Sequence, residues 1–233
     1  MNNRNFEEKI KYNFKNPELL EKALTHSSYD REHNRSSSGN NERLEFLGDA
    51  FFDAVVSVEL YKRLEKDDEG KLTKTRALIV CEKSLARVAK RLNIGSYINM
   101  GHGEEISGGR KRESILADAM EAVIGAIYLD GGYEETERFI AREFRETVEE
   151  ALAGKLFADY KTRVQELLQK RGQQVKISYI TDREEGPDHN KTFYVHLMCN
   201  DVILGQGSGK SKKEAEQNAA KDTLERRLEK NVF

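Results

Sequence analysis

The chain contains very few of the residues that cross-link or interrupt a fold. Its 233 residues include two cysteines, two prolines and no tryptophan. Because Cys81 and Cys199 lie far apart, they exclude a disulfide framework and a cysteine-based metal site, and they predict free thiols in a reducing compartment such as the cytoplasm. There is no charge-free apolar run of about 18 residues, which excludes a membrane span. The opening stretch MNNRNFEEKIKYNF lacks the apolar segment of a secretory signal.

Charge, by contrast, is abundant and unevenly distributed. Charged residues make up 34% of the chain and hydrophobic residues 37%, as in a soluble, folded protein. With Lys and Arg counted as +1 and Asp and Glu as −1, residues 1–150 sum to −5 and residues 151–233 to +3. A basic second part favours contact with a polyanion. Chance asymmetry between two soluble domains is the alternative.

Hydrophobic periodicity predicts an all-helical domain over residues 1–152, with no strand pattern. One helix opens with NERLEFLGDA and continues to about Tyr61, with an apolar face opposite its carboxylates. We expect three further helices: an amphipathic stretch around residues 85–92, a helix from Ser114 to the Gly131-Gly132 pair, and a final amphipathic helix over 133–152. The apolar face of the first helix is predicted to consist of Leu44, Leu47, Phe51, Val55 and Val58.

Beyond a short linker at 153–158, the pattern over residues 159–229 changes to helix, three strands and helix. A helical stretch over 159–172 precedes alternating runs at 175–179 and 193–197 and a shorter apolar run at 202–204. A glycine-rich turn and a last helix follow. This order predicts a small antiparallel sheet covered on one face by two helices. The chain is therefore expected to be a multi-domain protein, all-α and then α+β.

Three carboxylates crowd one face of the first predicted helix. Glu42, Glu45 and Asp49 follow the spacing i, i+3 and i+7, which places them within an arc of roughly 60°. Like charges at this spacing destabilise an isolated helix. Either the face lies in water or another group compensates the repulsion.

A second acidic pair lies in the helix that begins near Ser114. Asp118 and Glu121 are the only charged residues between Ile115 and Leu129, in a helix that is apolar or small on every side. Two carboxylates in such a helix are costly to ionise unless salt bridges or a bound cation compensate them. Both explanations fit the pair alone.

The two acidic helices together favour a cation. If their acidic faces oppose each other, Glu45, Asp49, Asp118 and Glu121 form an all-oxygen site of formal charge −4. Hard oxygen ligands favour Mg²⁺ or Mn²⁺ over zinc. Two such ions about 3.5–4 Å apart activate a water and stabilise the leaving oxygen in phosphodiester cleavage. Spacing alone does not establish that these helices meet.

The motifs that carry this chemistry resemble those of the ribonuclease III family. NERLEFLGDA at 41–50 resembles its signature, and LTHSSY at 24–29 and ESILADAMEAVIGAIYLDGG at 113–132 resemble its flanking motifs. The chain after residue 158 resembles the double-stranded RNA-binding domain of bacterial members. The signature usually ends in Ser where this chain has Ala50, a position to which we assign no chemistry.

The resemblance implies a role for each acidic position. It places metal ligands at Glu45, Asp118 and Glu121, and the catalytic pair at Asp49 and Glu121. It also assigns two acidic positions at the edge of the cleft and dimer, Glu42 and Glu69. The implied protein is a homodimer whose subunits each cut one strand of an RNA duplex, leaving 5′-phosphates, 3′-hydroxyls and short 3′ overhangs.

The last predicted helix begins with an anion-binding pattern. Ser211 and Glu214 form an S-x-x-E capping box, beside Lys210, Lys212 and Lys213. Free N–H groups and lysines at a helix start suit phosphate oxygens, although an ordinary solvated helix start has the same composition.

Two further elements favour RNA. The polar face of the helix near 160 and the turn GPDHNK offer groups that suit two shallow minor grooves of a duplex. The resemblance assigns RNA contacts at the same positions. The predicted RNA-binding residues are Thr162, Gln165, Glu166, His189, Lys210, Ser211, Lys212 and Lys213.

The sequence, with this resemblance, therefore predicts a Mg²⁺-dependent endoribonuclease for double-stranded RNA. Mn²⁺ is expected to substitute for Mg²⁺, and the expected cellular role is the processing of structured precursor rRNA and mRNA. A regulator that binds duplex RNA without cutting it is the rival from another class. A phosphohydrolase for small molecules is disfavoured because it gives the basic second part no role.

Overall fold

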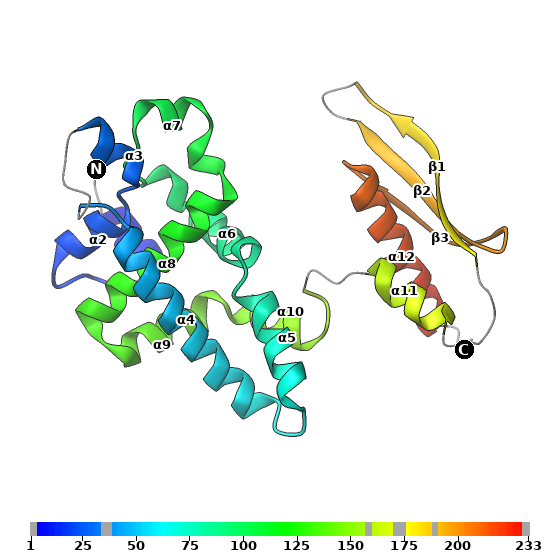
Figure 1. Ribbon diagram of the computed structural model, residues 1–233, viewed down its shortest axis with the longest axis horizontal. Coiled ribbons are helices and arrows are strands. Elements are labelled where there is room, and N and C mark those ends of the chain that lie inside the picture. The colour runs from blue at the N-terminus through cyan, green and yellow to red at the C-terminus, as the bar shows by residue number, and fades with distance from the viewer. Residues whose placement is uncertain (1–3, 34–38, 157–159, 170–175, 188–190, 230–233) are drawn as a thin grey trace. The chain divides into compact units, whose positions relative to one another are not determined.

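Residues 1–156 and residues 157–233 form separate units, the first built of helices and the second of a sheet with two helices (Figure 1). The computed structural model describes residues 4–33, 39–156, 160–169, 176–187 and 191–229. No helix among these residues is both long and apolar enough to cross a membrane. The predicted combination of an all-α part and an α+β part is confirmed.

The first unit contains ten α-helices and two short 3-10 helices in its described residues. The α-helices are α1 (Arg4–Ile10), α2 (Pro17–Ala23), α3 (Ser27–Glu32), α4 (Glu42–Arg63), α5 (Glu69–Ile79), α6 (Glu82–Arg91), α7 (His102–Ile106), α8 (Glu113–Gly131), α9 (Tyr133–Glu143) and α10 (Arg145–Leu152), and the 3-10 helices are η1 (Ile94–Ser96) and η2 (Gly109–Lys111).

Helix α8 lies at the centre of this unit. It packs against α2, α4, α6 and α9, and every residue from Ala122 to Ile127 is buried. A helix that is apolar on all sides is normally buried, and the elements packed around α8 bury this stretch. The predicted bounds of this helix, Ser114 to the Gly131-Gly132 pair, are confirmed to within one residue.

The predicted final helix over 133–152 is wrong, because the chain breaks into α9 and α10 at Phe144. Phe139 and Phe144 are both almost fully buried. Five residues apart on one straight helix, they would point about 140° away from each other. The break lets both rings enter the core, where Phe144 packs on Phe52 with ring centroids 4.4 Å apart.

The predicted apolar face of α4 is only partly correct. Leu44 and Val55 are buried as expected, but Val58 is 38% exposed. The buried face instead follows Leu44, Gly48, Phe52, Val55, Val56 and Leu60. Because Gly48 has no apolar side chain, the hydrophobic pattern does not mark it as buried. The predicted face therefore included its bulky neighbours in place of Gly48.

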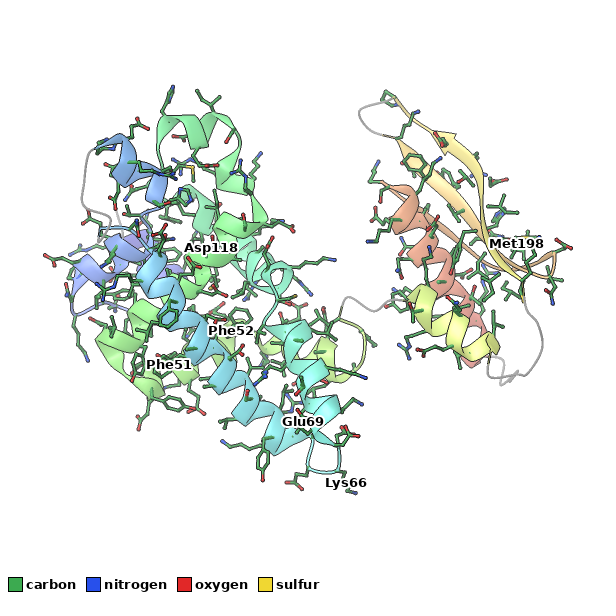
Figure 2. All side chains as sticks on the ribbon, viewed as in Figure 1. Phe51, Phe52, Lys66, Glu69, Asp118 and Met198 are labelled. Carbon is green, nitrogen blue, oxygen red and sulfur yellow. The ribbon has the colours of Figure 1, made fainter. Side chains whose placement is uncertain are left out.

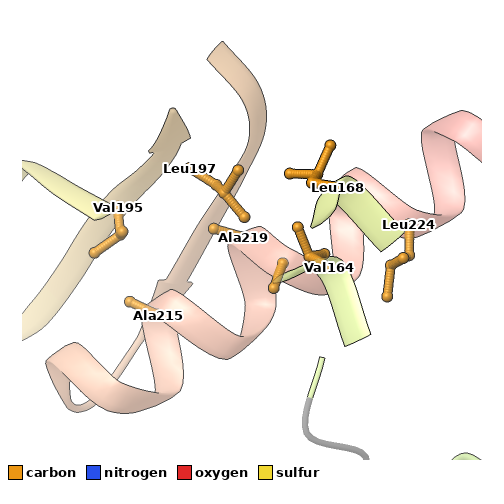
Figure 3. Close-up of a cluster of buried hydrophobic side chains, with 8 residues drawn as sticks. Val164, Leu168, Val195, Leu197, Ala215, Ala219 and Leu224 are labelled. Atoms are coloured by element: carbon orange, nitrogen blue, oxygen red, sulfur yellow. The ribbon is translucent and has the colours of Figure 1, made fainter. Parts of the chain in front are cut away.

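The second unit contains α11 (Tyr160–Gln169), the strands β1 (Ile177–Glu185), β2 (Thr192–Cys199) and β3 (Val202–Gly209), and α12 (Lys212–Glu229). The strands form one antiparallel sheet in the order β1-β2-β3. Both helices supply residues to one apolar core on one face of this sheet (Figure 3). The buried residues of this core are Val164, Leu168, Val195, Leu197, Ala215, Ala219, Ala220 and Leu224.

Two strands are longer than the sequence predicts. β1 continues through Arg183 and Glu184 to Glu185, and β3 continues through the segment predicted as a glycine-rich turn to Gly209. A Cβ atom at Gly207 would lie 2.1 Å from the backbone nitrogen of Ala219, so α12 packs directly on the strand backbone. These glycines therefore serve helix packing within a strand rather than a turn.

Candidate active site

Two glycines bring the acidic faces of α4 and α8 together. A Cβ atom at Gly48 would lie 1.8 Å from the carbonyl oxygen of Glu121, and one at Gly125 would lie 2.3 Å from that of Leu44. Only residues without a side chain allow two helix backbones to approach so closely. The crossing places the residues that flank Gly48 on α4 beside the turn of α8 that carries Glu121.

Three of the predicted metal ligands converge at this crossing. Carboxylate oxygens of Glu45, Asp118 and Glu121 all lie within 4.8 Å of one another, and all three side chains are half-buried. In the part of the chain that the structure describes, this is the one group of His, Cys, Asp and Glu residues arranged to hold a metal ion. The packing of α4 on α8, which spacing alone left open, is thus present.

The pKa of Glu121 is strongly perturbed. Burial, the largest cause, and the neighbouring carboxylates of Asp49, Glu45, Asp118 and Asp53 together raise it from 4.5 to about 8. Every charged group that shifts Glu121 is thus another carboxylate. Without a cation, the cluster relieves its repulsion by holding a proton.

The pKa values of the two other carboxylates of the group are shifted in the same direction. Burial raises the pKa of Glu45, and Asp118, Glu42 and Asp49 add to the effect. Burial also raises the pKa of Asp118, with a smaller contribution from Glu82. Converging, half-buried carboxylate oxygens fit a hard divalent cation, which supplies the positive charge that the site lacks.

Asp49 lies beside the group without joining it. Its side chain is exposed, and its charge acts on both Glu45 and Glu121. It therefore borders the cluster on the solvent side.

A fifth carboxylate, Asp53, was not predicted from the sequence. Its charge acts on Glu121, one of its oxygens is buried without a hydrogen-bond partner, and the Arg76 guanidinium lies 4.0 Å away. Burial raises the pKa of Asp53, while Arg76 opposes the shift. The signal was available, since Asp53 follows Asp49 by four residues and so shares its helix face.

The two predicted edge carboxylates lie in different places. Glu42 opens α4 and is exposed, and its charge raises the pKa of Glu45. Glu69 opens α5 and accepts a hydrogen bond from the Thr73 hydroxyl at 2.8 Å. Figure 2 shows Glu69 far from Asp118, near the opposite end of α4. Within one chain, Glu69 is therefore not part of the cluster.

In the second unit, α11 presents the predicted polar face. Thr162, Gln165 and Glu166 are exposed, whereas Val164 and Leu168 are buried in the core. Tyr160 donates its backbone N–H to the Gln217 side chain at 2.9 Å, which ties the start of α11 to α12. Core packing and this hydrogen bond together orient α11 so that its polar face points toward solvent.

The start of α12 carries the predicted capping box in a shifted form. The Ser211 hydroxyl accepts from the backbone N–H of Glu214 at 3.2 Å, as predicted. The Glu214 carboxylate accepts from the N–H of Lys210 at 2.7 Å, one residue earlier than in the standard box. Lys212 and Lys213 follow as exposed residues of the first turn. The predicted contact His189 lies outside the described residues.

Comparison with family models matches both units. The model described as Ribonuclease-III-like matches residues 16–148, and the model described as Double-stranded RNA binding motif matches residues 160–226. The second match assigns double-stranded RNA binding to the second unit.

Similar proteins cover nearly the whole chain. Ribonuclease 3 of Caldanaerobacter subterraneus subsp. tengcongensis is 53% identical over 218 residues, which are 94% of this chain and 95% of that protein. Ribonuclease 3 of Clostridium tetani is 48% identical over 225 residues, 97% of this chain and 94% of that protein.

A solved structure resembles the first unit. The nuclease domain of ribonuclease III from Campylobacter jejuni, described for structural flexibility in a region involved in dimer formation, is 46% identical. It matches with a TM-score of 0.58 over 62% of this chain and 97% of that chain. The likeness covers the unit that holds the carboxylate cluster.

Proposed function

Since this chain belongs to the ribonuclease III family and is an endoribonuclease for double-stranded RNA, we propose that it hydrolyses phosphodiesters with Mg²⁺ held by Glu45, Asp118 and Glu121, with Asp49 beside them. The observation that carries the proposal is the convergence of three half-buried carboxylates within 4.8 Å at the crossing of α4 and α8. Mn²⁺, which accepts the same hard oxygen ligands, is expected to substitute.

Each carboxylate has a distinct task in this proposal. Glu45 and Asp118 hold the cation from opposite helices, and Glu121 joins them from the most perturbed position. Asp49 and Glu121 form the catalytic pair, with Asp49 facing the solvent side from which a substrate enters. A bound Mg²⁺ supplies positive charge to the scissile phosphate and makes water a better nucleophile at neutral pH.

We propose that the products carry 5′-phosphate and 3′-hydroxyl ends with short 3′ overhangs. The overhangs require two staggered cuts, one on each strand of the duplex. A two-fold homodimer supplies them, because the strands of a duplex are themselves related by two-fold symmetry.

An exposed apolar face on α4 supports a homodimer formed through the nuclease domain. Phe46 is 79% exposed and Tyr61 74%, with Val58 between them at 38%. Ala50 and Ala54 are also exposed and continue the same face at helical spacing. Exposed apolar patches of this kind mark interaction sites. In the dimer, Glu42 and Glu69 are proposed to border the cleft.

We place the nuclease domain at residues 1–152 and the RNA-binding domain at 159–229, joined by the linker 153–158. In the RNA-binding domain, the exposed face of α11 and the segment that contains His189 would contact two minor grooves. Lys210, Lys212 and Lys213, with the free N–H groups at the start of α12, would bind the phosphates between them.

The proposed cellular task is processing of structured precursor rRNA and mRNA in the cytoplasm. Its support is the similarity to proteins named Ribonuclease 3 over nearly the full length of the chain.

A regulator that binds duplex RNA without cutting it is the alternative. The presence of all four core carboxylates favours the enzyme, since a protein that only binds RNA has no use for their mutual repulsion. The two proposals predict different fates for a bound duplex.

A gel assay separates them. A long, labelled RNA duplex is incubated with purified protein in Mg²⁺, in Ca²⁺ and in chelator, beside a single-stranded control. Short duplexes that appear only with Mg²⁺ support the proposed reaction. A duplex that is shifted but uncut in every condition would establish the regulator instead.

A further inference from the structure

One carboxylate sits among the lysines of the RNA-binding domain. Glu184, near the end of β1, has its Oε1 atom 3.2 Å from the Nζ of Lys212 and its Oε2 atom 3.6 Å from the Nζ of Lys191. The two lysines come from different elements, one from the first turn of α12 and one from the residue before β2. A single carboxylate therefore bridges two cations that are far apart in the chain.

The sheet register fixes where this bridge lies. Glu184 pairs with Phe193 across β1 and β2, and Phe193 pairs with Gly209 across β2 and β3. Gly209 leads directly into the start of α12, and the Lys212 ammonium lies 5.7 Å from the centre of the Phe193 ring. This row of residues thus holds the Glu184 carboxylate beside the helix start that is proposed to bind phosphate.

The bridge makes Lys212 and Lys213 unequal. Lys212 is bound to Glu184, whereas neighbouring Lys213 is exposed and makes no ion pair with any residue that the structure describes. Carboxylate and phosphate oxygens accept hydrogen bonds from the same ammonium group. A phosphate that binds Lys212 must therefore displace Glu184 or lie next to its negative charge.

We propose that Glu184 is a positioning residue that occupies Lys191 and Lys212 in the free protein as a stand-in for RNA phosphate, and thereby weakens duplex binding. The inference rests on the proposed function, in which the start of α12 contacts phosphates. The Glu184 carboxylate makes the affinity for RNA lower than it would be with the lysines alone. The cut duplex is therefore released faster.

The size of the effect follows from the exposure of the bridge. The Glu184 side chain is 35% exposed and that of Lys212 59%. Ion pairs this open to water are weak and screened by salt. Removing the carboxylate is therefore expected to tighten duplex binding about two- to five-fold at low salt.

The chain offers a matched control one residue away. Glu185 bonds to the Arg183 guanidinium at 2.7 Å and accepts from the Tyr194 hydroxyl at 3.1 Å, and contacts neither lysine. Glu184→Gln and Glu185→Gln remove the same charge from the same strand. Only the first removes the ion pairs with Lys191 and Lys212.

The test uses the full chain and a short RNA duplex in Ca²⁺, to suppress cleavage, over a salt titration. Glu184→Gln is expected to bind about two- to five-fold tighter than Glu185→Gln near 50 mM salt, with the gap closing as salt rises. In Mg²⁺, the same variant is expected to lower KM relative to Glu185→Gln without raising kcat, because the nuclease carboxylates are untouched and the more tightly bound product leaves more slowly. A purely structural role would not produce this split.

Two further variants decide which idea fails. Lys213→Gln weakens binding if the start of α12 contacts RNA. If Lys213→Gln weakens binding but the two glutamate variants bind alike, the inference is overturned and the proposed function stands. If Lys213→Gln has no effect on duplex binding, the proposed phosphate contact is wrong, and the inference is wrong with it.

The double variant Glu184→Gln, Lys212→Gln gives a second test. If Glu184→Gln tightens duplex binding as much in the Lys212→Gln background as in the wild type, the two residues act independently and the inference is overturned.

Discussion

Replacing Glu121 with Gln removes the charge from the centre of the carboxylate cluster while keeping the size of the side chain. The pKa of Glu121 is about 8 in the folded protein, against an ordinary value of 4.5. The folded state therefore holds this proton more tightly than the unfolded state. The resulting stability is fully present below the unfolded pKa and is lost as pH rises through about 8.

The magnitude follows from the same shift. At about 1.4 kcal/mol per pKa unit, full conversion gives a cost near 5 kcal/mol for the metal-free protein at pH 9. Because the cluster is only half-buried, solvent screens much of this repulsion, and we expect about 1–2 kcal/mol. Glu121→Gln cannot ionise and keeps that stability. Mg²⁺ restores it in the wild type, and the variant gains much less.

Urea unfolding at pH 6 and pH 9, in chelator and in Mg²⁺, measures both effects. Glu21→Gln is the control, since Glu21 is exposed and its side chain has no partner among the described residues. Glu121→Gln is also expected to bind a duplex without cutting it. An equal loss of stability by Glu121→Gln and the wild type between pH 6 and pH 9 in chelator would refute the assigned role of Glu121.

Calorimetry gives an independent check on the same group. A carboxyl of pKa about 8 is roughly nine-tenths protonated at pH 7. Binding of Mg²⁺ must displace that proton, so titrations in buffers of different ionisation enthalpy should report the release of about one proton per site. Glu121→Gln should release almost none. An equal release from both proteins would place the proton elsewhere.

Three further substitutions test the fold around the sites. Gly48→Ala should destabilise the protein by about 1–3 kcal/mol in thermal unfolding and abolish cleavage, because its Cβ would overlap the Glu121 carbonyl, whereas Gly103→Ala, with nothing within 4 Å, should be harmless. Phe46→Ser should convert the proposed dimer to monomers in sedimentation equilibrium, whereas Ile106→Ser, similarly exposed but on α7, should not. Dimers that survive Phe46→Ser would exclude the α4 face as the interface. Gly207→Ala should lift α12 from β3 and abolish duplex binding in a gel shift, and unchanged binding would contradict the packing described.

Patterns that repeat along one element were predictable from the sequence. The 3.6-residue period predicted the course of α4, the apolar run that ends at the Gly131-Gly132 pair predicted α8, and the alternation of Phe193, Val195 and Leu197 predicted β2. Helix starts were also readable, because the Ser211 cap acts on an N–H only three residues away. Each of these signals lies within a few positions of the residue it affects.

The predictions failed where a distant neighbour decided the outcome. The helix over 133–152 breaks so that Phe144 can reach Phe52 on α4. Gly205, Gly207 and Gly209 belong to β3 rather than a turn, because α12 leaves no room there for side chains. Glycine carries the same letter in both settings, and only the packed neighbour distinguishes them.

The candidate active site divides in the same way. The sequence by itself determined which carboxylates share a helix face, because that depends on spacing alone. Only the tertiary structure decided that α4 meets α8 at Gly48 and Gly125, that Glu45, Asp118 and Glu121 converge there, and that Asp53 adds its charge. Helix periodicity is a local property, whereas the contact between two helices far apart in the chain depends on how every neighbouring element packs around them.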